Sequence, residues 1–166
     1  MTAPTTTPRP VRVRARTVHL AAVAVSEPGD GRPRDCLSTC LEAARTALTD
    51  AGLVPGQVSV LLYTGVYRTA MLSEPAMAAV VADGLGLRGG SRLLAFDSVN
   101  GRSGFLQACF LAERILSRTP RRDPRHPPIG LVCTSESPST SGIVNQAELG
   151  VPDLGAAAVV TLGSGG

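Results

Sequence analysis

The sequence has no lysine and no tryptophan, and aromatic residues make up only 3% of its 166 residues. A core with so few rings has to be built from Ala, Val, Leu and Ile, which suits a layered α/β protein. No apolar run approaches the roughly 20 residues that span a bilayer. The opening MTAPTTTPRP also lacks the apolar segment of a secretory signal. We therefore expect a cytoplasmic protein without a membrane partner.

Arginine alone supplies the positive charge that gives the chain its net charge of +3. The arginines are concentrated in two stretches, residues 9–16 and 118–125, and neither stretch contains an aromatic residue. A nucleic-acid site would combine clustered charge on a folded element with stacking rings for single strands. We interpret both stretches as solvated loops and expect no nucleic-acid partner.

The sequence has four cysteines, Cys36, Cys40, Cys109 and Cys133. The first two are spaced to share one face of a helix, and the other two lie within apolar runs. Disulfides are not expected in a reducing cytosol. Only His19 and His126 could add imidazole ligands, and neither shows a metal-ligand spacing. We predict small side chains that are buried or half-buried, with no metal and no cofactor.

Alternating strand and helix patterns predict one α/β domain over residues 11–163, between a disordered tail at 1–10 and a short tail at 164–166. The predicted strands are 11–25, 58–66, 93–97, 129–134 and 156–162. The predicted helices are 36–51, 75–85 and 103–118, with Ser73 and Glu74 at the N-terminus of the second. Residues 103–118 are apolar around nearly the whole circumference, so this helix needs cover on every side.

The string FDSVNGRSGF at residues 96–105 resembles the nucleophile turn of the thiolase and ketosynthase-III superfamily, with Arg102 at the position of the family's catalytic cysteine. A guanidinium has no nucleophilic electron pair. Arg102 is either a structural plug held by a salt bridge or a site for an anion at a helix N-terminus, and we favour the plug. Ser103 is predicted to start or cap the helix rather than act as a nucleophile. Cys109 lies about 10 Å further along that helix and cannot replace the missing cysteine.

Three further strings extend the resemblance over most of the chain: YTGVYRTAMLSEPA at 63–76, GLGL at 84–87 and DLGAAAVVTL at 153–162. Together they resemble the N-terminal half of ketosynthase-III-like thiolases, most closely the OleA type. The resemblance implies a five-stranded mixed sheet with helices on both faces. It also implies acyltransferase chemistry, because OleA-type enzymes join two acyl chains by a non-decarboxylative Claisen condensation in fatty acyl, β-lactone or polyketide-type biosynthesis.

The resemblance also singles out Glu74. OleA-type enzymes carry a Leu-Glu-Pro string whose glutamate reaches across the dimer into the other active site. Here the string is Leu72, Ser73, Glu74 and Pro75, with one residue inserted. The resemblance implies that Glu74 is the catalytic base that removes the α-proton of an acyl thioester. The alternative is an acidic residue that complements the dipole at a helix N-terminus.

The family's catalytic histidine and asparagine belong to its C-terminal half, which has no counterpart in this sequence. The chain therefore resembles the cysteine-less subunit of a lipstatin-type heterodimer. We expect a full-length, cysteine-bearing thiolase homologue as partner, joined along residues 92–97 in a heterodimer or a heterotetramer. The expected substrates are acyl-CoA or acyl carrier protein thioesters. Two alternatives remain open: a non-catalytic scaffold or chain-length subunit, and one half of a split ketosynthase.

Overall fold

The computed structural model describes residues 17–26, 32–71, 74–87, 93–119, 127–138 and 150–163. Its strands are β1 (Val18–Val25), β2 (Val58–Tyr63), β3 (Leu94–Asp97), β4 (Ile129–Glu136) and β5 (Leu154–Leu162). Its α-helices are α1 (Cys36–Asp50), α2 (Met77–Gly84) and α3 (Gly104–Leu116). The predicted tails at 1–10 and 164–166, and the predicted start of the first strand at 11–16, lie outside the described residues.

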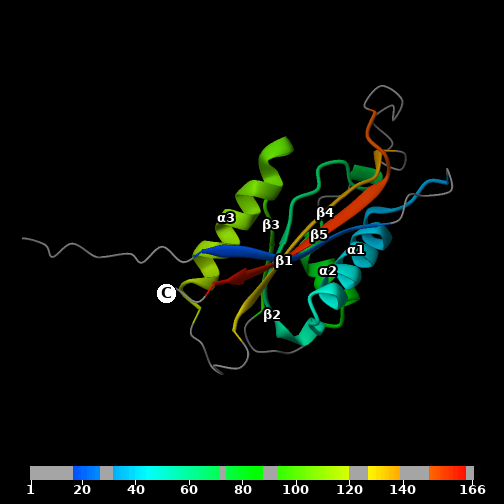
Figure 1. The fold of residues 1–166 in the computed structure, drawn as a ribbon. Helices are drawn as coiled ribbons and strands as arrows, with labels where there is room; N and C mark the ends of the chain where they lie inside the picture. Colours follow the sequence, from blue (N-terminus) through cyan, green and yellow to red (C-terminus); the bar gives the residue numbers. More distant parts are fainter. Residues whose placement is uncertain are drawn as a thin grey trace, which may run out of the picture.

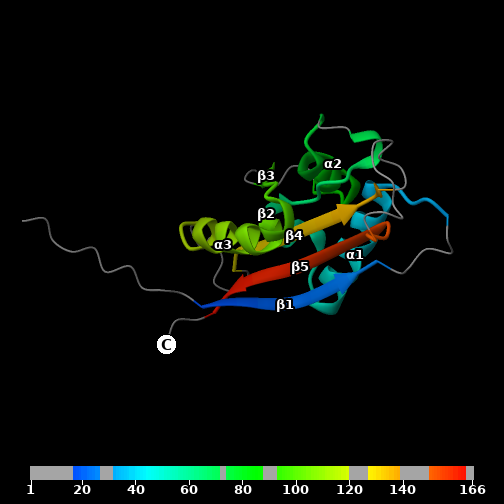
Figure 2. The same cartoon turned by 90° about the horizontal axis from the view of Figure 1, so that it is seen from above.

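The five strands form one mixed sheet in the order β1-β5-β4-β2-β3. β2 runs parallel to both β3 and β4, whereas β5 runs antiparallel to β4 and β1. Helices α1 and α2 cover one face and α3 covers the other (Figures 1 and 2). Parallel strands with both faces covered are continuously apolar, which explains the sequences of β2 and β4. The predicted five-stranded mixed sheet with helices on both faces is confirmed.

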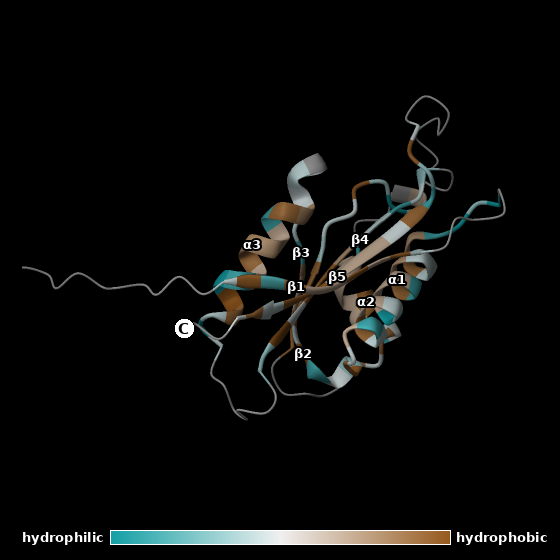
Figure 3. Cartoon of the chain, viewed as in Figure 1, coloured by the Kyte–Doolittle hydropathy of each residue, from teal (hydrophilic) through white to brown (hydrophobic). Residues whose placement is uncertain are grey.

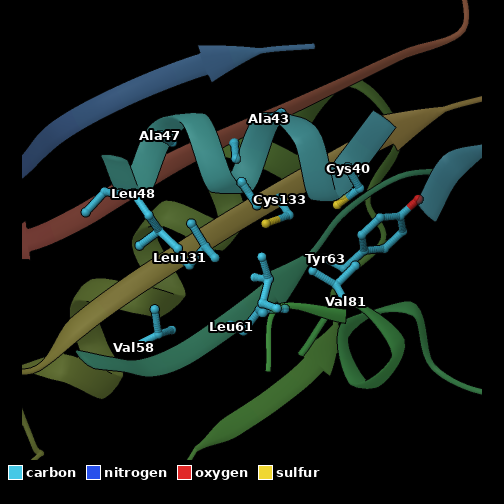
Figure 4. Packing of buried hydrophobic residues seen from close by; sticks show 14 of the residues in the cluster. Cys40, Ala43, Ala47, Leu48, Val58, Leu61, Tyr63, Val81, Leu131 and Cys133 are labelled. Atoms are coloured by element: carbon cyan, nitrogen blue, oxygen red, sulfur yellow. The ribbon is translucent and has the colours of Figure 1, made fainter. Parts of the chain in front are cut away.

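The larger of the two cores lies between the sheet and the helices α1 and α2 (Figure 4). Small residues of α1, among them Cys40, Ala43 and Ala47, pack on Leu131 of β4 and Leu61 of β2. Because these side chains are short, the helix lies close to the strands. Cys36, Cys40 and Cys133 are buried and Cys109 is half-buried, as predicted.

The close approach of α1 to β5 predicts that Gly155→Ala destabilises the fold. A Cβ at Gly155 would lie 2.7 Å from the amide nitrogen of Cys40 and still closer to the carbonyl group of Thr39. Backbone atoms in a helix cannot move aside as a flexible side chain could, so we expect the free energy of unfolding to fall by about 2 kcal/mol. Urea unfolding measures the change. Gly56→Ala is the control, because no atom lies within 4 Å of its added Cβ, and equal stability of the two variants would contradict the packing.

Helix α3 buries only one side, and the smaller core lies beneath it. Ala108, Ala112 and Leu116 face the sheet, whereas Leu106 is 72% exposed and Phe110 is 58% exposed. Figure 3 shows hydrophobic residues along much of this helix. The predicted apolar circumference of residues 103–118 is therefore present, and its outer side is uncovered in the single chain.

The same face of the sheet is also uncovered at β1. Residues paired across neighbouring strands share a face of the sheet, and Val160 of β5 packs in the core beneath α3. Leu20 pairs with Val160 and Val23 pairs with Ala158, two residues before Val160, so both β1 side chains lie on the α3 face. Both are exposed. Exposed apolar side chains of β1 and α3 thus lie on the same side of the sheet.

None of the helices in the described ranges is both long enough and apolar enough to cross a lipid bilayer.

Candidate functional site

The segment around Glu74 differs from the sequence-based prediction. Helix α2 begins at Met77 with Ala76 as its N-cap, not at Pro75, and the predicted N-terminal Ser73 lies outside the described residues. The amides of Met77 and Ala78 donate to the Asp97 carboxylate, at 3.1 and 2.8 Å. Asp97 therefore complements the dipole of α2. The first turn holds no acidic residue of its own, and Asp97 rather than Glu74 accepts the hydrogen bonds from its amides.

Asp97 also holds the neighbouring loop through an ion pair that the sequence analysis missed. Its Oδ2 lies 2.8 Å from Nη2 of Arg68, and the two side chains are only 17% and 11% exposed. The Arg68 guanidinium lies 5.2 Å from the centre of the Tyr63 ring. Burial raises the pKa of Tyr63, whose hydroxyl hydrogen-bonds to the Ser135 carbonyl at 3.0 Å. These contacts fix the loop after β2 to the start of α2.

Glu136, at the end of β4, holds the same loop from the other side. Its carboxylate accepts hydrogen bonds from the amides of Val66, at 3.0 Å to Oε1, and Tyr67. Ala70, further along the loop, has a φ of 51°, a left-handed conformation that costs about 1–2 kcal/mol for a residue with a Cβ. The anchored loop therefore keeps an unfavourable backbone conformation next to Glu74.

A hollow of about 330 Å3 lies between the start of α1, the loop after β2 and the start of α2. Its apolar lining consists of Cys36, Leu37, Pro75, Met77 and Val80. Its polar lining consists of Asp35, Arg68, Thr69 and Glu74. Arg68 pairs with Asp97, and the hydroxyl of Thr69 accepts from the Cys36 amide at 3.0 Å.

Glu74 differs from the other polar groups of this hollow. Asp35 accepts a hydrogen bond from the Ser38 amide, at 2.9 Å. Within the ranges that the structure describes, the Glu74 carboxylate takes part in no hydrogen bond and no ion pair. It is exposed, so it is available to a ligand or to another chain.

Asp35 is the N-cap of α1, and we predict that its contribution to the free energy of unfolding depends on pH. Burial alone would raise the pKa of Asp35, but hydrogen bonds from Ser38 and Leu37 together hold this pKa below the ordinary value of 3.8. The stabilisation is therefore present above about pH 4 and is lost as the pH falls through the lowered folded-state pKa. We expect Asp35→Ala to cost about 1 kcal/mol at pH 7 and less at pH 2. Urea unfolding at both pH values measures this difference, and an equal cost at both would contradict the assignment.

The turn that carries Arg102 has the strand, turn and helix geometry that the resemblance implies. After β3, Gly101 adopts a φ of 47°, a single 3-10 turn covers Gly101–Ser103, and α3 follows. A Cβ at the buried Gly104 would lie 3.3 Å from Cβ of Thr64, so the helix start packs closely on the loop after β2. Ser103 is the N-cap residue of α3, as predicted, although its hydroxyl makes no capping hydrogen bond. The side chain of Arg102 lies outside what the structure describes, so the plug and the anion site stay predictions.

Glu74 and residue 102 both follow the carboxyl ends of parallel strands, β2 and β3. The helices that come after them pack on opposite faces of the sheet. Glu74 precedes α2, which packs in the larger core, and residue 102 precedes α3, which packs in the smaller core. None of the described residues that line the hollow beside Glu74 belongs to the turn. The backbone at residue 102 and Glu74 thus lie on segments that lead to opposite faces of the sheet.

Cys109 and His19 are unsuited to act as a nucleophile or a base beside the turn. Burial raises the pKa of the Cys109 thiol, which leaves little thiolate at neutral pH. His19 lies on β1, and His126 lies outside the described residues. The described part of the chain also contains no group of three or more His, Cys, Asp or Glu side chains that could hold a metal ion.

Solved structures show where this fold occurs. The chain matches Xanthomonas campestris OleA with bound lauric acid and lauroyl-CoA at a TM-score of 0.69 and 20% identity, over 87% of this chain and 56% of that one. It matches AbyA1, described as a tetronic acid condensing enzyme, at a TM-score of 0.70 and 22% identity, over 88% of this chain and 51% of that one. No family model and no curated protein matches the sequence.

The chain thus spans little more than half the length of the solved structures that it matches. The matches cover 87–89% of this chain, and the predicted resemblance is confirmed at the level of the fold. The chain has a thiolase-like fold that matches about half the length of each of these two structures.

Proposed function

We propose that this chain is a ketosynthase-like subunit that pairs with a cysteine-bearing thiolase homologue and supplies Glu74 as the base for Claisen condensation of two acyl thioesters. The observation that carries the proposal is the placement of Glu74. Its carboxylate is exposed, lacks a partner in the described ranges, and lies on the opposite face from the helix that follows residue 102. Such a carboxylate is better placed to serve another chain than its own turn.

The condensation needs a nucleophile and a base. We assign the nucleophile to the partner and the base to this chain. The partner's cysteine holds one acyl group as a thioester. Glu74 removes the α-proton of a second acyl thioester, and the resulting carbanion attacks the carbonyl carbon of the first. A carbon–carbon bond forms, the bond to the partner's sulfur breaks, and the proton stays on Glu74 until it passes to solvent. Similarity of fold to OleA with bound lauroyl-CoA supports acyl thioesters as the substrate class.

Strand β3 supplies the edge along which we place the partner. Among the described strands it pairs with β2 alone, so its other side presents unpaired backbone groups to a second strand. Leu94 on this strand is 46% exposed. Asp97 ends the same strand and caps α2, which links this edge directly to the segment that carries Glu74.

The proposed pairing predicts that Leu94→Asp weakens the complex. A charge buried at a strand interface loses its hydration without gaining a partner, so we expect the dissociation constant to rise about tenfold or more. Val54→Asp is the matched control, because Val54 is 62% exposed and lies on the connection before β2. Gel filtration and titration of the two purified chains measure complex formation. Equal binding by both variants would place the partner elsewhere.

A split ketosynthase is the second candidate, and one observation favours it. Leu106 and Phe110 of α3 and Leu20 and Val23 of β1 are exposed apolar side chains on the same side of the sheet, and another chain could cover them. Co-expression with a chain that corresponds to the remaining half of the matched structures tests this candidate. If the co-expressed complex binds less of a hydrophobic dye than this chain alone, the split ketosynthase is supported. Unchanged dye binding would rule it out.

A further inference from the structure

We propose that the hollow beside Glu74 binds the aliphatic chain of an uncharged acyl thioester, with the thioester at the mouth next to the Glu74 carboxylate. The inference deepens the proposed function, on which the catalytic role of Glu74 rests, by assigning the tail of the substrate to this subunit. The binding itself rests on the hollow alone.

The walls of the hollow suit a hydrocarbon chain. Leu37 of α1 and Met77 and Val80 of α2 face it from two helices, and Leu37 and Met77 continue into the larger core. Its volume of about 330 Å3 lies at the lower end of the roughly 300–1,000 Å3 typical of small-molecule pockets. A short or medium acyl chain fits this size better than a long one.

The wall is held in place before any ligand arrives. The Arg68–Asp97 ion pair and the two hydrogen bonds from α2 to Asp97 fix one side. The hydrogen bond from the Cys36 amide to Thr69 fixes the loop to the start of α1. A preformed pocket costs little conformational entropy on binding.

Charge at the rim selects against a free fatty acid. The hollow carries the carboxylates of Asp35 and Glu74, and the positive charge of Arg68 is balanced by Asp97. A ligand carboxylate at the mouth would therefore meet like charges, which disfavour its binding. A thioester is uncharged and avoids this repulsion. The same carboxylate that repels the acid would lie beside the α-carbon of the thioester.

Binding to the full-length chain tests the inference without any condensation assay. The probes are S-octanoyl-N-acetylcysteamine, which is an uncharged thioester, and octanoate, and isothermal titration calorimetry measures both. We expect the thioester to bind about tenfold or more tightly than octanoate. Affinity should rise by up to about fourfold per methylene from the butanoyl to the hexanoyl thioester. Glu74→Gln should reduce the difference in affinity between octanoate and the octanoyl thioester, because one of the two carboxylates at the mouth is then uncharged.

Two neighbouring positions on α2 provide matched variants. Val80 lines the hollow, whereas Ala79 is exposed and does not line it. Val80→Phe should fill the hollow and weaken thioester binding about tenfold or more, and Ala79→Phe should leave binding unchanged. Thermal unfolding of both variants shows whether each is folded before binding is measured.

Three outcomes would overturn the inference: equal thioester binding by the two variants, binding of octanoate as tight as that of the thioester, or displacement of the thioester by the cysteine-bearing partner. The last would assign the hollow to a partner side chain. Failure of the proposed function has a different signature. In that case Glu74→Gln leaves condensation by the complex unchanged, while thioester binding and its sensitivity to Val80→Phe persist.

Discussion

Replacing Asp97 by alanine is expected to lower the free energy of unfolding by about 3 kcal/mol. The change leaves the buried Arg68 without its anion and removes the acceptor for the amides of Met77 and Ala78. An uncompensated buried charge and the loss of a helix cap both destabilise the folded state. No other single side chain in the described part of the chain joins a strand end, a helix start and the loop after β2 in this way.

Urea unfolding of matched variants measures this effect. Asp97→Asn keeps one carbonyl oxygen as an acceptor and loses the charge. Its free energy of unfolding should therefore lie between those of the wild type and Asp97→Ala. Asp50→Ala, at the end of α1, is the control carboxylate and should stay within about 0.5 kcal/mol of the wild type. If Asp97→Ala behaves like Asp50→Ala, the ion pair and the cap contribute nothing and the account of the site is wrong.

Glu74→Gln is expected to reduce condensation by the complex about 100-fold or more. An amide keeps the shape of the side chain but cannot accept the α-proton. Because Glu74 has no structural partner in the described ranges, the variant should fold and assemble as the wild type does. Steady-state rates at saturating acyl thioester measure the loss, and gel filtration verifies the assembly.

The control for this variant is Asp50→Asn, which removes a carboxylate at the far end of α1 from the hollow. Its condensation rate should match that of the wild type. An intact complex in which Glu74→Gln retains the full rate would show that the chain is a non-catalytic scaffold or a chain-length subunit. The pairing proposal would survive that result, and the base proposal would not.

The periodic elements of this fold could be predicted because their signals are local. The apolar runs of β2 and β4 and the i, i+4 pattern of α1 are sufficient to identify them, and the predicted helix 36–51 ends within one residue of the observed Cys36–Asp50. The start of α2 was predicted two residues too early because its cap comes from Asp97, which lies 20 residues from Met77 in sequence. Such a contact leaves no local signal in the helix itself.

The candidate site was predicted only in part, for the same reason. The motif resemblance identified Glu74 and the turn at Arg102, but the hollow is assembled from three segments separated in sequence. A signal for the Arg68–Asp97 pair was nevertheless available. Tyr63 and Asp97 occupy matching positions in the parallel pair β2 and β3, so an arginine shortly after the first strand can reach an aspartate at the end of the second.

The most direct test of trans donation adds this chain to its cysteine-bearing partner and follows condensation of two acyl thioesters. We expect no product from either chain alone, product from the mixture, and no recovery of activity when the added chain carries Glu74→Gln. Full activity of the partner alone would contradict the central claim, because the base would then belong to the partner.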